Sequence, residues 1–152
     1  MATTHHRDDS LPFVDHILAA RLTTLLARVT LTFPFWWSGF DKMLHPAMAL
    51  SEIRSMGFPP LPYLDGYLYG FLLVVQIGGS FAIIANRYAW LGAGALGVFT
   101  AIVTFLAHAF WRLEGVARAN EMNVFLEHIA LIGGLVFAAM QSQVMHDNRH
   151  KR

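Results

Sequence analysis

The sequence predicts an all-α integral membrane protein, a bundle of four transmembrane helices with a short amphipathic helix in its first extramembrane loop. Two observations carry this prediction. Apolar residues occupy 55% of the 152 positions, whereas Asp, Glu, Lys and Arg occupy only 14%, against about 25% in ordinary soluble domains. The apolar residues also gather into four long stretches, at 17–40, 67–85, 88–111 and 123–141.

Each stretch is long enough to cross a bilayer, because about 20 helical residues span a hydrocarbon core of about 30 Å. None of them alternates apolar and polar residues as a barrel strand would. The flanking segments, 1–16 and 142–152, are polar tails. The acidic character of the first tail and the length of the first stretch argue against a cleaved signal peptide. We therefore expect one domain over residues 17–141.

The loop after the first stretch contains a short helical pattern. Pro46 suits an early helical position, and Gly57 suits a stop. Leu50, Ile53 and Met56 would then share one face. This helix either caps a pocket or serves as a simple connector.

Charge and composition restrict the partners and the orientation. The net charge is +1, with no basic cluster beyond the short C-terminal tail, so nothing supports nucleic-acid binding. The absence of cysteine excludes thiolate chemistry and iron–sulfur clusters. The lipid bilayer is the expected surrounding. Six Lys and Arg residues flank the membrane on the side of the tails and four on the other side, which predicts that both termini are cytoplasmic.

Two polar residues interrupt the apolar stretches near their middles. Arg28 and Gln76 each lie about ten residues into a predicted helix, where a charged group costs roughly 3 kcal/mol on insertion scales. The structural interpretation is a buried pair in which Gln76 and backbone carbonyls satisfy Arg28. The functional alternative is a clamp for an anion or a carbonyl group.

A second polar group gathers at the ends of the stretches opposite the tails. Antiparallel packing brings its members to a similar depth, and we expect them to form a ligand-binding mouth: Trp37, Asp41, Lys42, His108, Trp111, Glu127 and His128. Trp37, Phe40, Phe105 and Trp111 would wall a slot, with His108, Lys42 or Arg112 as donors. The alternatives are a purely structural hydrogen-bonded network, a metal site and a haem site. The metal site is disfavoured because none of the four apolar stretches contains an HxxxH or ExxH pattern. The haem site is disfavoured because adjacent helices pack only about 8–10 Å apart.

These residues, over positions 25–140, resemble the DoxX family of small four-helix bacterial membrane proteins. The resemblance rests on elements in a fixed order: Arg28 with Gly39, Asp41 and Lys42; Gly57 and Pro59; Gly78, Gly79 and Arg87; His108, Phe110 and Trp111; and the run from Phe125 to Gly134. Many members of the family have a glutamate where this chain has Gln76, and a carboxamide does not carry a proton as a carboxylate does.

The resemblance implies a protein of the bacterial cytoplasmic (inner) membrane that is linked to quinone-dependent oxidation, as in subunits of quinol oxidase or thiosulfate:quinone oxidoreductase. We hypothesise a subunit that binds quinone, or a similar lipophilic carbonyl compound, for a redox partner protein or a larger membrane complex. The chain carries nothing that moves electrons by itself, so hydride or electron chemistry needs a bound cofactor or a partner protein. Quinone is the candidate cofactor that the resemblance implies. The alternatives are a structural or assembly subunit without a ligand and a small permease.

Overall fold

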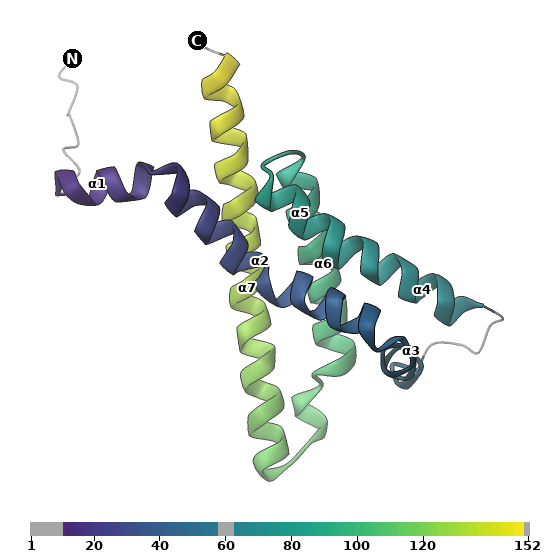
Figure 1. Cartoon of the computed structure of the whole chain (residues 1–152). Coiled ribbons are helices and arrows are strands. Elements are labelled where there is room, and N and C mark those ends of the chain that lie inside the picture. The colour runs from purple at the N-terminus through teal and green to yellow at the C-terminus, as the bar shows by residue number, and fades with distance from the viewer. Residues whose placement is uncertain (1–10, 58–62, 151–152) are drawn as a thin grey trace, which may run out of the picture.

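The computed structural model describes residues 11–57 and 63–150, and within them all regular structure is helical. The all-α prediction is therefore confirmed. The elements, shown in Figure 1, are α1 (Pro12–Ala19), α2 (Arg21–Leu44), α3 (Pro46–Ser55), α4 (Leu64–Leu73), the π-helix η1 (Val74–Gly78), α5 (Gly79–Ile84), α6 (Ala89–Ala107), the 3₁₀ turn η2 (Phe110–Arg112) and α7 (Gly115–His150).

Three helical segments are long and apolar enough to cross a membrane: Leu64–Ile84, Ala89–Arg112 and Gly115–Met145. The first of them is α4, η1 and α5 in continuous succession. A fourth span is obtained when α1 and α2 are counted together, although they are bent by 60° at the break between them. The chain is thus a multi-pass membrane protein by the length and composition of its helices.

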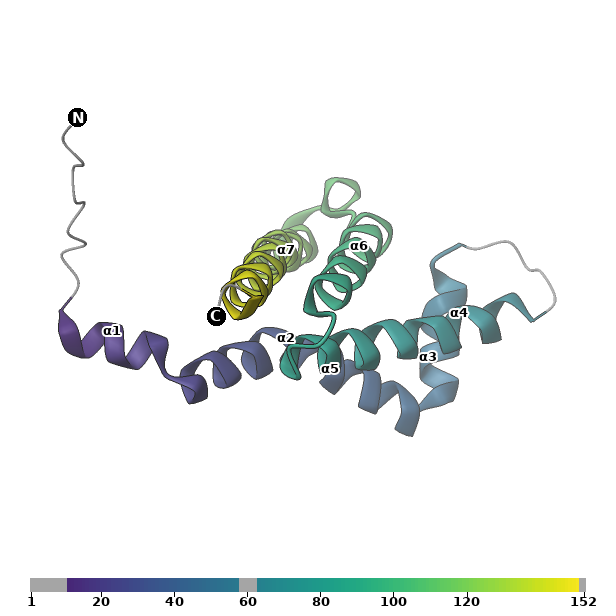
Figure 2. The same ribbon diagram turned by 90° about the horizontal axis from the view of Figure 1, so that it is seen from above.

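The helices form two antiparallel pairs that cross (Figures 1 and 2). One layer contains α2 beside the helix from α4 to α5, and the other contains α6 beside α7. The start of α2, the turn from α5 to α6 and the C-terminal part of α7 share one end of the bundle, which we call the tail end. The helix α3, the start of α4, the turn η2 and the start of α7 lie toward the opposite end, the loop end.

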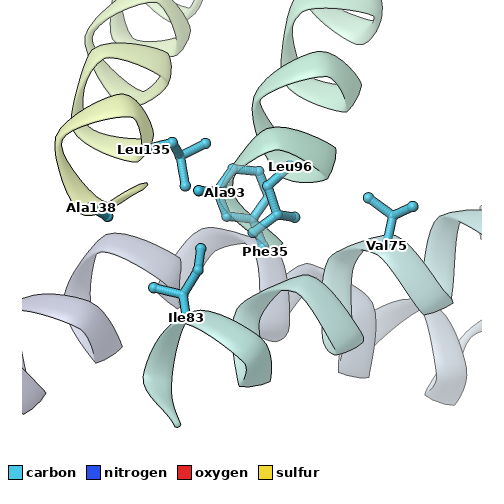
Figure 3. Packing of buried hydrophobic residues seen from close by; sticks show 7 residues of the cluster. All are labelled: Phe35, Val75, Ile83, Ala93, Leu96, Leu135 and Ala138. Carbon is cyan, nitrogen blue, oxygen red and sulfur yellow. The ribbon is translucent and has the colours of Figure 1, made fainter. Parts of the chain in front are cut away.

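A small apolar core lies where the two layers meet (Figure 3). It contains Phe35, Val75, Ile83, Ala93, Leu96, Leu135 and Ala138. Lipid tails are as apolar as these side chains, so close van der Waals packing stabilises the contact more than the hydrophobic effect does. The core holds the two layers together where they cross. Toward the loop end the layers are not filled by this core.

The structure corrects two helix boundaries. The first predicted helix, 17–40, is broken at Ala20, whose backbone is extended (φ −66°, ψ 135°), and α2 then continues to Leu44. The fourth, predicted at 123–141, runs over Gly115–His150, because helical hydrogen bonds continue past the apolar stretch into polar flanks. Both predicted tails therefore contain helix. The domain limits of 17–141 stay a prediction.

The predicted loop helix is confirmed as α3, which begins at Pro46 and ends at Ser55. Its Ala49 and Ile53 are buried, one turn apart, and Leu50 and Met56 are half-buried. One face of α3 therefore packs on the bundle. The proline-rich segment 59–62 that follows lies outside the described residues.

The close contact between α5 and α6 provides a stability prediction. A Cβ atom on Gly92 would lie 2.6 Å from the carbonyl oxygen of Gly79, whereas one on Gly97 would meet nothing within 4 Å. We expect Gly92→Ala to lower the free energy of unfolding in detergent by about 1–3 kcal/mol, because a backbone atom cannot rotate aside. Gly97→Ala is the matched control and should leave the thermal midpoint unchanged or slightly raised. Equal midpoints for both variants would contradict this contact.

Candidate ligand-binding site

A cavity of about 440 Å³ lies toward the loop end of the bundle, bordered by α2, α4, η1, α6, α7 and α3. This volume is within the usual range of small-molecule sites. Among the described residues, eight polar side chains line it: Ser38, Lys42, Glu52, Ser55, Gln76, Thr100, His108 and His128. Phe35, Leu72, Phe99 and Val103 contribute apolar walls. We call it the polar cavity.

Gln76 is buried, with 5% of its surface exposed. Its Nε2 donates to Ser38 Oγ over 3.5 Å. Its Oε1 is buried and accepts no hydrogen bond from the part of the chain that the structure describes. An unmet buried acceptor costs roughly 1–3 kcal/mol. A residue of the cavity wall therefore carries a buried acceptor that the described residues leave unmet.

The local backbone explains how Gln76 reaches this position. Gln76 lies in the π-helix η1, a wider turn that recurs at functional sites. On the facing helix, a Cβ atom at Gly39 would lie 2.7 Å from Ile77 Cγ1. The glycine therefore lets η1 approach α2 closely enough for Gln76 to contact Ser38.

Lys42 connects the cavity wall to α3. Its Nζ donates to Ser38 Oγ over 3.0 Å and lies 3.1 Å from Glu52 Oε2 on α3. The hydroxyl of Tyr69 on α4 donates to the Lys42 carbonyl oxygen over 3.1 Å. Glu52 and Ser55 of α3 line the cavity, as does Met56 directly after it. The structure therefore favours the role of a cap that covers a pocket, rather than that of a simple connector, for the loop helix.

Two histidines line the cavity where α6 ends against α7. His108 Nδ1 lies 2.7 Å from Glu121 Oε2, and His128 Nδ1 lies 2.9 Å from Thr104 Oγ1. The rings of the two histidines meet edge to face, 4.9 Å between centroids. The hydrogen of Thr104 is already donated to the Thr100 carbonyl oxygen, so we assign the proton of His128 to Nδ1. When the rings are neutral, both histidines then keep Nε2 as an acceptor.

The structure brings only part of the predicted mouth together. Lys42, His108 and His128 line the polar cavity, whereas the other four residues do not: Trp37, Asp41, Trp111 and Glu127. Trp37 is 60% exposed, Asp41 pairs with His45 at 3.1 Å, and Glu127 is exposed on α7.

Helical rotation is the reason for these outward positions. Each residue turns the helix by about 100°, so Trp37 and Asp41 share one face of α2 while Ser38 and Lys42 share the next. The four residues predicted as aromatic walls do not line the polar cavity either and are all exposed: Trp37, Phe40, Phe105 and Trp111. The aromatic side chains that line it are those of Phe35 and Phe99.

Sequence reasoning missed several participants that spacing indicates. Ser38 precedes Lys42 by four residues, and Glu121 precedes His128 by seven, so each pair shares a helix face. Thr104 precedes His108 by four residues near the end of α6. The prediction considered only the depth of each residue in the membrane. If it had also considered which face of its helix each residue occupies, it would have included Ser38, Thr104 and Glu121.

Arg28 and Gln76 are both buried, but Gln76 Oε1 accepts no hydrogen bond from Arg28. Arg28 is 6% exposed, and its Nη2 approaches Met145 Sδ of α7 at 3.6 Å. Gln76 lies beside Ser38, ten residues, or about 15 Å of helix, further along α2 than Arg28. Both residues were expected near the midplane, but only Gln76 belongs to the cavity.

Metal ligation has no geometric support in the described part of the chain, where no group of three or more His, Cys, Asp or Glu residues lies close enough to hold an ion. In the predicted alternative ligand set, the rings of His108 and His128 are in contact, whereas Glu127 is exposed on α7 and does not line the polar cavity.

Comparison with known proteins gives a family assignment. The family model described as DoxX matches residues 23–109, more than half of the chain, from the first turns of α2 to the residue after His108. No curated protein and no solved structure matches. The matched region contains Ser38, Lys42, Gln76 and His108, whereas α7, with Glu121 and His128, lies beyond it.

Proposed function

Because the chain belongs to the DoxX family, we propose that this membrane protein binds quinone, or a similar lipophilic carbonyl compound, for a redox partner protein or a larger membrane complex. The observation that carries the proposal is Gln76, which lines the polar cavity and whose buried Oε1 accepts no hydrogen bond within the described residues. The hydroxyl group of a reduced quinone, unlike the carbonyl oxygen of the oxidised form, would donate to it.

The side chains around the cavity suit both the oxidised and the reduced form of such a ligand. Ser38 Oγ accepts from Gln76 and from Lys42, so its own hydrogen is free for a ligand. Lys42 Nζ has three hydrogens and two protein partners, Ser38 and Glu52. Ser38 and Lys42 can donate hydrogen bonds to the carbonyl oxygens of a quinone. Gln76 Oε1 and the histidine Nε2 atoms can accept hydrogen bonds from the hydroxyl groups of a quinol. The quinone would supply the redox chemistry that the cysteine-free chain lacks.

Extraction of the purified protein tests this proposal. The protein is solubilised gently from its membranes, extracted with organic solvent and analysed for quinone, with an unrelated four-helix membrane protein from the same cells as the control. We expect quinone in near-stoichiometric amount, well above the control. An extract no richer in quinone than the control would refute the proposal.

We also propose that the protein lies in the bacterial cytoplasmic membrane with both termini in the cytoplasm, which places the polar cavity nearer the outer surface. Reporter fusions at residue 87 and at the C-terminus are expected to report the cytoplasm, and a fusion within 46–62 the outside, because of the excess of Lys and Arg at the tail end. The opposite pattern would invert the orientation.

A further inference from the structure

A second cavity, of about 520 Å³, adjoins the polar cavity. It lies between α3, the helix from α4 to η1, and α6, and all the described residues that line it are apolar. We call it the apolar cavity. The two cavities share five lining residues, which form the boundary between them: Met56, Leu72, Phe99, Val103 and Leu106.

The far rim of the apolar cavity is open toward the surface of the bundle. Phe71 and Ile102 line it, and each is more than half exposed. Ile102 lies within a membrane-spanning segment, so this rim faces lipid. A hydrocarbon chain entering from the bilayer would therefore reach the boundary with the polar cavity without crossing water.

The charges of the polar cavity indicate what kind of head it accepts. The ammonium group of Lys42 is matched by the Glu52 carboxylate at 3.1 Å. Gln76 lines the cavity, and its buried Oε1 accepts no hydrogen bond within the described residues. An anionic head would meet this acceptor unfavourably and find no unmatched cation among the lining residues that the structure describes, whereas an uncharged hydroxyl group would donate to it.

We propose that the two cavities form one site for a single-tailed, uncharged amphiphile, with its hydroxyl- or carbonyl-bearing head in the polar cavity and its hydrocarbon tail in the apolar cavity. This inference rests on the proposed function and narrows its ligand class, because a compact, tail-less carbonyl compound would leave the apolar cavity unused. The shared apolar boundary is the place where the tail passes.

The test compares three probes by the rise each produces in the thermal midpoint of the full-length protein in lipid nanodiscs. The probes are a benzoquinol with a decyl tail, the same benzoquinol without a tail, and decanoate. A reductant keeps the quinols reduced, which the cysteine-free chain tolerates. A ligand that binds the folded state raises the midpoint. We expect a rise with both quinols and none with decanoate.

Two variants block the apolar cavity, Ile102→Trp on its rim and Gly94→Phe on its wall. Ile129→Trp, at a similarly exposed position of α7, and Gly97→Phe, three residues from Gly94 on α6, are the controls. We expect both blocking variants to lose the rise with the tailed quinol and to keep the rise with the tail-less one, while the controls keep both.

Each outcome decides one claim. A rise with the tailed quinol that persists in both blocking variants would overturn the tail site and leave the proposed function standing, and a rise with decanoate equal to that of the tailed quinol would overturn the uncharged head. No rise with either quinol in the unmodified protein would overturn the proposed function itself.

Discussion

Gln76→Met is expected to abolish ligand retention and to stabilise the ligand-free protein at the same time. Methionine nearly matches the volume of glutamine but has no amide, so the ligand loses its hydrogen bond to the buried Oε1. The variant would leave the buried hydroxyl group of the ligand without an acceptor, which costs about 1–3 kcal/mol, or roughly 5- to 150-fold in Kd. Without ligand, removal of an unmet acceptor should raise the thermal midpoint, because the 3.5 Å contact to Ser38 is long.

The opposite signs of these two effects distinguish a binding residue from a structural one. Thermal unfolding followed by circular dichroism, and quinone content after purification, measure them separately. Gln141→Met, on an exposed position of α7, removes a carboxamide outside the cavity and should change neither quantity. A fall in the midpoint of Gln76→Met, with ligand retention unchanged, would assign Gln76 a structural role.

Glu121→Leu is expected to weaken ligand binding about tenfold, or about 1.4 kcal/mol, although Glu121 does not line the cavity. Glu121 acts as a positioning residue, because its carboxylate accepts from His108 Nδ1 at 2.7 Å and so orients a ring that does line the cavity. The side chains of His108 and Glu121 are only 22% and 36% exposed. Loss of this pair should also lower the free energy of unfolding by on the order of 1 kcal/mol.

Rescue by a conservative variant separates positioning from stability alone. Glu121→Gln keeps an oxygen acceptor for Nδ1 and should restore most of the affinity, measured by titration with the tailed quinol. The control is Asp41→Leu, which removes a similar pair with His45 that is 54% and 59% exposed and away from the cavity. Equal loss of affinity in Glu121→Leu and Glu121→Gln, or a loss in Asp41→Leu, would contradict this role.

The helical class and the membrane-spanning segments were predictable because both depend on local properties. The apolar runs 67–85 and 88–111 lie close to Leu64–Ile84 and Ala89–Arg112, since the bilayer alone sets the length of an apolar helix. Pro46 and Gly57 likewise indicated α3. The break at Ala20 was not predictable from apolarity, because no proline or glycine stands there.

The candidate site was predictable in part. Depth in the membrane follows from position along a helix, and this identified Lys42, His108 and His128 as neighbours. The direction in which each side chain points depends on how the helices rotate against one another, and that placed Trp37 and Glu127 outside. Counting residues from the ends of the predicted helices put Arg28 and Gln76 at the same depth in the membrane. In the structure they lie at different depths, because α2 begins at Arg21 and the antiparallel register of η1 against α2 places Gln76 beside Ser38.

The sequence by itself determined that this chain is helical, that its helices are long enough to span a membrane and that polar groups collect at the loop end. These properties follow from composition and periodicity, which act within single segments. Only the tertiary structure decided that Gln76 has an unmet acceptor, that α3 covers a polar cavity and that an apolar cavity adjoins it. These depend on close approaches between separate helices, such as η1 against Gly39, and such distances result from the packing of all the segments together.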